Sequence, residues 1–302
     1  MAAVITTSSG IKLSIAPLIS DTNAFLSCTI DEAVGGDMVK MTVRMATDRD
    51  PCSVLDTMSV KLVNDTGWAF KFKVYVYELS YAEGSATVKM YGCSPQFLRT
   101  VKTDVFYGMD EAIASVWDGD VDKNAEADTP TGLRLYQKNE SGYSFLKRVM
   151  PGYKYDTIWG FGMSGLAIRD MNNWSEEYRF YRKYNASPVS MPSVGSPKLY
   201  DEEVEILDTF SNHYKVRHGQ KVFDVSKEYF ELMRNTMHNS RLATSKADLT
   251  FKSPILAPCC IGAHVAYSNY DSDVRRLFLS ARTVDIQKAA SEVSYTLKTF
   301  DP

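Results

Sequence analysis

The sequence predicts a β-rich α+β fold in which two antiparallel β units are separated by a helical connector. Apolar and polar residues alternate in four short runs before residue 93, and this alternation returns after residue 200. Between these regions the apolar residues recur at the spacing of helices. Because side chains alternate between the faces of a strand but return to one face of a helix about every 3.6 residues, the change of period separates the β units from the connector.

The chain of 302 residues is too long for one small hydrophobic core. Its composition, with 44% hydrophobic and 24% charged residues, is typical of a folded soluble protein. This length fits two domains of ordinary size, or one domain with a large insertion, so we expect more than one core.

Four runs in the first β unit predict antiparallel strands of a small barrel or sandwich. Turn-forming residues separate the runs, for example Gly35-Gly36-Asp37 and Asn64-Asp65-Thr66-Gly67. One face of each predicted strand is apolar, as expected where that face meets a core. The apolar residues are Met41, Val43 and Met45; Met58, Val60 and Leu62; Phe70, Phe72, Val74 and Val76; and Val88 and Met90.

Tyrosines lie in or beside the third of these strands. Tyr75 and Tyr77 alternate with its apolar residues, and Tyr81 follows a few positions later. Aromatic residues are enriched in protein interfaces, but they also fill cores. The sequence leaves two interpretations open: these tyrosines anchor an interface, or they form a second layer of the same core.

The connector contains signals for three helices. Ser94 followed by Pro95 marks the start of the first helix, since proline is well suited to the first helical position. Ser144 is the expected N-cap of the third helix, and Pro151 is its expected stop. The apolar residues of the second and third helices are Ile113, Val116 and Trp117, and Phe145, Leu146, Val149 and Met150.

A stretch rich in proline and serine, Tyr184–Lys198, is typical of a linker or an extended surface arm. Strand character resumes at Val204–Phe210, and an amphipathic helix is indicated over Tyr229–Met237. Alternation then predicts strands over Leu277–Arg282 and Tyr295–Phe300. The second β unit therefore extends to the end of the sequence.

Gly160, Gly162 and Gly165 spell the G-x-G-x-x-G pattern of a dinucleotide-binding loop. That loop works between a buried strand and a helix whose N-terminus faces the pyrophosphate, with an acidic residue about 20 positions later. The following run, Leu166–Trp174, ends in turn formers and carries no helical stripe, and Glu176-Glu177 are the nearest acidic candidates for the ribose position. The pattern favours a glycine-rich β-hairpin. A nucleotide-binding enzyme using this loop remains the alternative.

The sequence carries no complete catalytic motif, and we assign no catalytic residue. Ser164 lacks the G-x-S-x-G spacing of a nucleophile elbow. Asp201, Glu202 and Glu203 are the carboxylates on which a glycosidase would depend, because that chemistry needs two carboxyl groups across a sugar bond. Surface carboxylates are common, so a solvated strand entrance is the favoured interpretation. A cell-wall hydrolase is the second alternative.

We also expect no metal site and no cofactor. The run Asp118–Asp128 superficially resembles a calcium loop, but Lys123 and Thr129 occupy the positions that require glycine and glutamate, and the register that starts at Asp120 fails as well. A solvated loop is therefore favoured. The histidines lack metal-ligand spacing, and the cysteines, which form no C-x-x-C pair, indicate buried free thiols. They are His213, His218, His238 and His264, and Cys28, Cys52, Cys93, Cys259 and Cys260.

A net charge of −3 gives no general attraction to nucleic acid or anionic lipid. The first eight residues lack a basic region and a sustained apolar core, so they do not predict a signal peptide. The apolar stretch Ile255–Tyr267 is broken by Pro258 and His264 and is too short to span a bilayer. We expect a protein made in the cytosol, with no specific nucleic-acid partner and no membrane insertion.

The order of these elements resembles that of phage tail baseplate hub proteins of the T4 type, which are related to the N-terminal part of type VI secretion spike proteins. The resemblance comprises a β unit closing near Tyr91-Gly92-Cys93-Ser94, a helix over Ser144–Met150, a hairpin over Thr157–Asp170 and a terminal β unit. It is one of layout and spacing, and it covers most of residues 21–302.

This resemblance implies two small antiparallel β-barrel domains: the first covers residues 21–93, after an N-terminal arm over 1–20, and the second covers 201–302 and has a helical insertion. An inserted α/β connector with the glycine-rich hairpin, over 94–200, links them. It implies a structural virion protein of the tail baseplate, with no catalytic residues, that is made in the host cytoplasm. Three subunits would form a homotrimeric ring joining the hexameric tail tube to the central spike. The implied partners are the tail tube protein, the central spike protein and other baseplate or tape-measure proteins. The segments 118–128 and 184–198 depart from the simplest layout.

Overall fold

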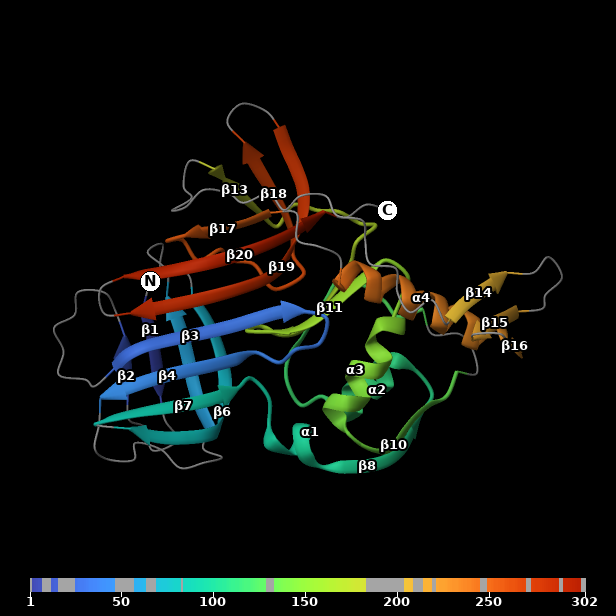
Figure 1. Cartoon of the computed structure of the whole chain (residues 1–302), viewed down its shortest axis with the longest axis horizontal. Helices are drawn as coiled ribbons and strands as arrows, with labels where there is room; N and C mark the ends of the chain where they lie inside the picture. The colour runs from blue at the N-terminus through green and yellow to red at the C-terminus, as the bar shows by residue number, and fades with distance from the viewer. Residues whose placement is uncertain are drawn as a thin grey trace.

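A sheet of 15 strands dominates the computed structural model, and the helices lie to one side of it (Figure 1). Two smaller sheets, of two and three strands, accompany it. The structure describes residues 2–6, 12–15, 25–46, 57–63, 69–82, 84–128, 133–182, 204–208, 214–218, 221–244, 249–269, 273–287 and 290–299.

The first β unit contains the strands that the alternation predicts. In β4, Met41, Val43 and Met45 are buried, whereas Lys40 and Arg44 are exposed. The predicted N-terminal arm contributes two strands, of which β1 pairs antiparallel with both β2 and β5. The strands are β1 (Ala2–Thr6), β2 (Lys12–Ile15), β3 (Phe25–Val34), β4 (Lys40–Ala46), β5 (Thr57–Val63), β6 (Ala69–Ala82) and β7 (Ser85–Tyr91).

The connector combines short helices with strands. Ser94 caps the first helix, because its Oγ accepts a hydrogen bond from Phe97 N at 3.2 Å. The elements are α1 (Pro95–Arg99), β8 (Val101–Phe106), α2 (Met109–Val116), β9 (Val121–Lys123), β10 (Leu135–Ser141), α3 (Gly142–Val149), the 3-10 turn η1 (Met150–Gly152), β11 (Thr157–Gly162), β12 (Gly165–Asp170) and β13 (Tyr178–Tyr181).

The predicted cap of the third connector helix is wrong by one turn. Helix α3 begins directly after Ser141, whose Oγ accepts a hydrogen bond from Ser144 N at 3.2 Å. A serine on extended backbone can reach the amide three residues ahead, whereas Ser144 already lies inside the first turn. The expected stop is confirmed, since α3 ends at Val149 and Pro151 lies in the 3-10 turn that follows.

The second β unit contains the predicted helix and strands. Helix α4 covers the amphipathic stretch predicted over Tyr229–Met237, and Figure 1 shows β14 to β16 beside one end of it. No helix among the described residues is both long and apolar enough to cross a membrane. The elements are β14 (Val204–Asp208), β15 (Tyr214–His218), β16 (Lys221–Val225), α4 (Lys227–Thr244), β17 (Leu249–Ser253), β18 (His264–Asn269), β19 (Asp273–Gln287) and β20 (Ser291–Thr299).

Strand β19 joins the two β units into one sheet. It pairs antiparallel with β3, from Ala281 opposite Ala33 to Gln287 opposite Ser27, and also pairs with β18 and β20. The main strand order is β13-β18-β19-β3-β4-β7-β6-β5-β1-β2. The predicted β-rich character is confirmed, and the residues that the structure describes form no closed barrel.

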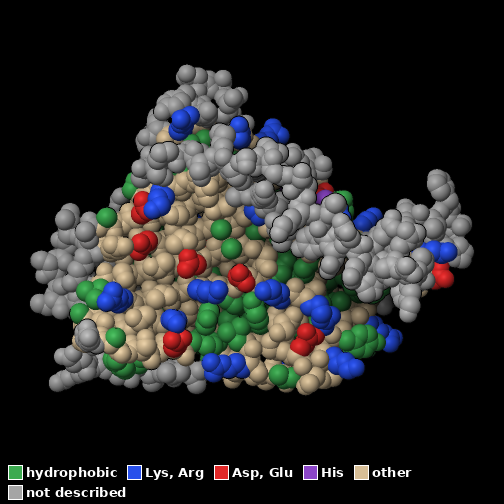
Figure 2. Space-filling model, in the orientation of Figure 1, with side chains coloured by type: hydrophobic (Ala, Val, Ile, Leu, Met, Phe, Trp, Pro, Cys, Tyr) green, Lys and Arg blue, Asp and Glu red, His purple; other side chains and the backbone are tan. Residues whose placement is uncertain are grey.

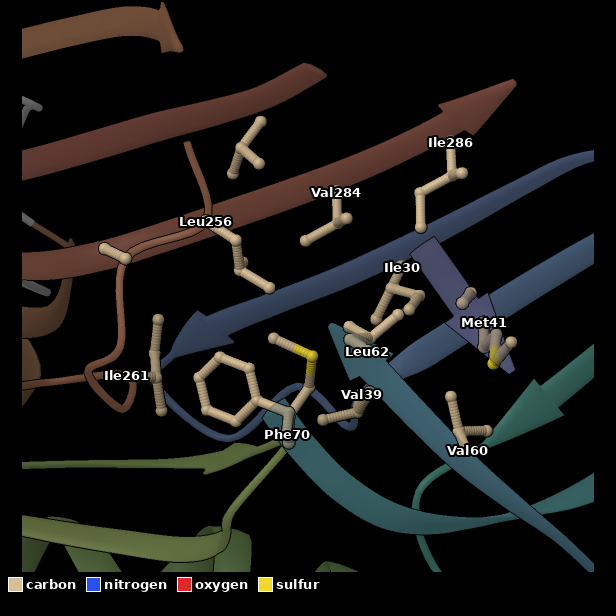
Figure 3. Close-up of a cluster of buried hydrophobic side chains, with 14 of the residues drawn as sticks. Ile30, Val39, Met41, Val60, Leu62, Phe70, Leu256, Ile261, Val284 and Ile286 are labelled. Atoms are coloured by element: carbon tan, nitrogen blue, oxygen red, sulfur yellow. The ribbon is translucent and has the colours of Figure 1, made fainter. Parts of the chain in front are cut away.

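The main hydrophobic core draws on both β units (Figure 3). Ile30, Leu62 and Phe70 come from the first unit, and Leu256 and Ile286 come from the second; all five are buried. Burial of such side chains contributes about 1.5–3 kcal/mol each. The two units therefore share a core as well as a sheet.

A second core lies in the connector. The ring of Trp117 lies 5.1 Å from that of Phe97 and 5.0 Å from that of Phe161, measured between centroids. Phe161 belongs to β11, whereas Met163, in the turn that follows β11, is buried in the main core. The β11–β12 hairpin is therefore the element that spans the two cores.

Candidate functional site

The glycine-rich segment forms the predicted β-hairpin. Strands β11 and β12 pair antiparallel as far as Gly162 opposite Gly165, and Met163 and Ser164 form the two-residue turn. Gly165 has a φ of +104°, a conformation that residues with a side chain rarely adopt. After β12 the chain bends and enters β13 without forming a helix. The helix N-terminus that a dinucleotide loop needs is therefore absent from this described segment.

The two acidic candidates for the ribose position are engaged elsewhere. Glu176 forms an ion pair with Arg179, with 2.6 Å between Oε2 and Nη2. Glu177 Oε1 accepts a hydrogen bond from His264 N at 3.2 Å and lies 3.6 Å from Arg169 Nε. Both carboxylates hold local structure, so neither stands in the position of a ribose ligand.

The glycines allow the hairpin backbone to approach two neighbouring segments. A Cβ atom on Gly160 would lie 2.9 Å from the carbonyl oxygen of Ala33 in β3. A Cβ atom on Gly165 would lie 2.2 Å from the carbonyl oxygen of Asp120, which accepts a hydrogen bond from Leu166 N at 2.9 Å. Their spacing therefore serves packing between backbones rather than approach to a phosphate.

A buried ion pair lies beneath the hairpin turn. Arg282 of β19 and Glu32 of β3 have side chains that are 0% and 1% exposed, and Arg282 Nε donates to Glu32 Oε1 at 2.7 Å. Arg282 Nη1 also donates to the carbonyl oxygen of Ala257 at 3.0 Å, and its guanidinium lies 4.8 Å from the centre of the Phe70 ring. Glu32 Oε2 accepts from Met163 N at 2.7 Å. This network ties β3, β19 and the hairpin turn together.

Electrostatics keeps this arginine charged. Burial alone would lower the pKa of Arg282, but the adjacent Glu32 carboxylate holds that pKa above its ordinary value. Arg282 lies at the end of the predicted strand Leu277–Arg282. Its partner is 250 positions away, so no local pattern indicated the buried pair.

A second network connects the acidic segment 118–128 to the hairpin. Arg169 of β12 donates to Asp122 Oδ2 at 2.7 Å, and the Cys260 thiol donates to the same oxygen at 2.9 Å. Most of the segment is exposed, as expected for a solvated loop, but Val121–Lys123 form a short strand, β9, which pairs parallel with β12. Backbone pairing and the Arg169 ion pair thus organise part of the predicted loop.

The described cysteines are free and largely buried, as the sequence predicts. Burial raises the pKa of Cys28 and of Cys259 to about 12, and it raises that of Cys93 as well. Burial together with Asp122 raises the pKa of Cys260 to about 11, even though the Ser164 hydroxyl, whose Oγ lies 3.2 Å from the sulfur, lowers it. These thiols are protonated near neutral pH and are poor nucleophiles.

Both histidines whose side chains are described make local contacts. His264 Nδ1 accepts a hydrogen bond from Ser175 N at 3.1 Å, and burial lowers its pKa. His238 of α4 contacts the side chain of Asp156 and stacks on Tyr155, with 4.1 Å between ring centroids. Among the described residues, no group of three His, Cys, Asp or Glu side chains could hold a metal ion.

Asn239, next to His238, fixes helix α4 to the connector. Its Oδ1 accepts a hydrogen bond from Thr157 N at 3.1 Å, and its Nδ2 donates to the carbonyl oxygens of Pro151 and Lys154 at 2.7 and 2.6 Å. All three bonds reach residues more than 80 positions away and end at the start of β11 or just before it. The α4 segment is thus attached to the same hairpin as β3 and β19.

Some predicted features lie outside the described residues. These are the arm predicted over 184–198, the carboxylates Asp201, Glu202 and Glu203, and Cys52, His213 and the side chain of His218. Their roles remain predictions.

A cleft of about 730 Å³ lies beside the hairpin turn, between strands β5 and β6 and the connector. Lys61, Lys71 and Lys73 line the strand side. The connector side carries the acidic turn Asp118–Asp120 and the hairpin turn Met163–Gly165. This cleft brings together parts of both candidate motifs, the glycine pattern and the acidic run. No sequence pattern indicated that the three lysines would lie opposite these motifs.

The three tyrosines of β6 differ in their surroundings. Tyr77 packs edge-on against Tyr91, with 4.7 Å between ring centroids, and the Arg99 guanidinium lies 5.1 Å from the Tyr77 ring. Tyr77 thus serves as a second layer of packing within the chain, whereas the Tyr81 side chain is 51% exposed. Figure 2 shows hydrophobic side chains gathered over the region where β7 leads into α1.

No protein-family model matches the sequence, and no curated protein matches it significantly. Solved structures do resemble the fold. A tail protein from Neisseria meningitidis MC58 has a TM-score of 0.64 at 11% identity, over 98% of this chain and 96% of that one. The 43 kDa tail protein of prophage MuSo2 from Shewanella oneidensis has a TM-score of 0.62 at 10% identity, over 99% of this chain and 98% of that one.

A type VI secretion component of E. coli, itself structurally similar to tail proteins of bacteriophage T4, is also similar. Its TM-score is 0.59 at 8% identity, over 98% of this chain and 77% of that one. The fold is therefore that of phage tail and type VI spike-related proteins. The predicted resemblance to baseplate hub proteins is confirmed at the level of the fold.

Proposed function

We propose that this chain is a structural virion protein, a phage tail baseplate hub that forms a trimeric ring and joins the hexameric tail tube to the central spike. The observation that carries this proposal is the full-length correspondence with tail proteins. At least 98% of this chain aligns with at least 96% of two such proteins. A fragment shared by unrelated proteins would leave much of one chain uncovered.

The internal architecture supports a mechanical role. A ring subunit needs a fixed relation between its parts, and here the β3–β19 pairing, the buried Glu32–Arg282 pair and the hairpin hold the two β units together. We propose that residues 21–93 and 201–302 act as the two barrel-like domains, with 94–200 as the connector. Sheet edges invite pairing between subunits, and closure of a ring removes them.

We infer a mechanical role with no catalysis, with the protein made in the host cytoplasm and used in the virion tail. The protonated thiols and the locally bonded histidines support this inference. The partners would be two further copies, the tube and spike proteins, and other baseplate or tape-measure proteins. Similarity to a type VI secretion component supports a spike partner in particular.

Electron microscopy of tails carrying a gold-labelled copy of this chain tests the proposal. We expect label at the junction of tube and spike, and nowhere along the tube. Label at the distal fibres or in the capsid would contradict the hub role. Absence of the chain from purified particles would contradict the structural role altogether.

A further inference from the structure

We propose that the outward face of β5 and β6 is a docking surface for a carboxylate-rich polypeptide segment of a partner protein. We call it the lysine face, and it consists of Ser59, Lys61, Lys71, Lys73 and Tyr75. It forms one wall of the cleft beside the hairpin turn. The proposal is independent of the ring arrangement, because it rests on the strand register of this face and on the charges that line the cleft.

Strand register concentrates positive charge on this face. Antiparallel pairing places Lys61 directly opposite Lys71, and Ser59 directly opposite Lys73. All four of these side chains are exposed, whereas Val60 and Val74 on the other face are buried. Every polar side chain of the lysine face can donate a hydrogen bond, and none is a carboxylate.

The lysines have no acidic partner among the described residues. Neighbouring Lys89 of β7 differs, because its Nζ donates to Glu78 Oε1 at 3.0 Å. Like charges directly opposite each other destabilise a sheet. The chain therefore tolerates an unfavourable Lys61–Lys71 pair that a bound carboxylate would relieve. This is the pattern expected where a surface is shaped for binding at the expense of stability.

The opposite wall favours a polypeptide over nucleic acid. Asp118 and Asp120 are exposed there and would repel a polyanion that carries phosphates on every side. An extended polypeptide can present carboxylates on one side only, since its side chains alternate. Lys71 and Lys73 lie two positions apart on one strand, which matches the spacing of alternate side chains in such a segment.

The test uses the full chain and a fluorescein-labelled ten-residue peptide of alternating glutamate and threonine. Fluorescence anisotropy at low ionic strength measures its binding to the unmodified chain, to Lys61→Glu/Lys71→Glu/Lys73→Glu and to a matched control. The control, Lys102→Glu/Arg134→Glu/Lys138→Glu, makes the same charge change at exposed positions on or beside strands β8 and β10.

We expect the peptide to bind the unmodified chain and the control, and to bind the lysine-face variant at least about tenfold more weakly. Added salt should weaken the binding that remains. Equal loss in both variants, or no binding by the unmodified chain, would overturn the proposal. Tighter binding of a ten-nucleotide single-stranded DNA than of the peptide would overturn it in favour of nucleic acid.

A single substitution separates binding from folding. Lys71→Glu places a carboxylate opposite Lys61, so we expect it to raise the Tm while it weakens peptide binding. Loss of binding together with a raised Tm cannot come from unfolding. A lowered Tm would contradict the inference that the opposed lysines are unfavourable in the free chain.

Discussion

At the scale of single residues, the most consequential feature is the Glu32–Arg282 pair. Desolvating two charges is costly, and the attraction between them offsets that cost only where the remaining donors and acceptors are satisfied. Here Ala257 O and Met163 N complete the network. The pair therefore holds β3, β19 and the hairpin turn together. Loss of one partner would leave the other charge buried and unpaired.

Replacing Arg282 with methionine is expected to lower the free energy of unfolding by about 3–5 kcal/mol, since Glu32 would remain buried without its partner. Urea denaturation monitored by circular dichroism measures the change. Arg44→Met, on the exposed face of β4, is the control and should cost well under about 1 kcal/mol. A similar small loss for both variants would show that the buried pair does not hold the β units together.

Asp122 predicts a pH dependence of stability. Burial would raise its pKa, but hydrogen bonds from Arg169 and Cys260 outweigh burial and lower it. A carboxyl group whose pKa is lower in the folded state stabilises the protein above its unfolded pKa of about 3.9, and this contribution disappears as the pH falls through the folded value. Asp122→Asn should therefore flatten the loss of stability below about pH 5. Parallel pH profiles of urea stability for the variant and the unmodified chain would contradict this expectation.

The sequence could predict individual residues only where the signal was local. Ser94 and Pro95 were identified as a helix start from their own sequence, and the amide that Ser94 caps lies only three residues ahead. Arg282 could not be recognised as buried, because Glu32 is 250 positions away and alternation alone marks polar residues as solvated. The lysine face could not be predicted either, because only the pairing register of β5 and β6 places Lys61 opposite Lys71.

At the scale of elements, the glycine-rich hairpin connects the parts of the molecule. Its identity could be predicted from the sequence, because turn formers and the missing helical stripe after Gly165 are local signals. Its contacts could not be predicted, since β3, Asp120 and Asn239 approach it from distant parts of the chain. The glycines mark where those backbones come close.

Gly160→Ala is expected to lower the free energy of unfolding by about 1–3 kcal/mol, because its Cβ would meet backbone atoms of β3 that cannot move independently. Chemical denaturation gives the change. Ser115→Ala, at an exposed position in α2, serves as the control and should be close to neutral. A neutral effect of Gly160→Ala would mean that β11 and β3 are not in close contact.

Asn239→Ala is expected to loosen α4 from the connector. The change leaves Thr157 N and two carbonyl oxygens without their partner, which should cost about 1–3 kcal/mol. Hydrogen exchange should increase around residues 150–157 and in α4. Arg241→Ala, exposed on the same helix, should leave exchange unchanged. Unchanged hydrogen exchange in Asn239→Ala would show that Asn239 does not hold α4 against the connector.

At the scale of the whole molecule, the sequence predicted the order of elements and the presence of two β units. It could not predict that β19 pairs with β3, because such long-range pairing leaves no mark in local periodicity. The resemblance in layout nevertheless identified a fold that solved tail proteins share along their length. Order and spacing of elements carried that information where sequence identity is about a tenth.

The most direct test of the hub proposal is mass measurement of the full chain co-expressed with candidate tail tube and spike proteins. We expect a complex that contains three copies of this chain together with both partners. The oligomeric state of the chain alone, monomer or trimer, does not decide the claim; the composition of the co-expressed complex does. A chain that stays separate from tube and spike proteins, which themselves assemble without it, would contradict the proposal.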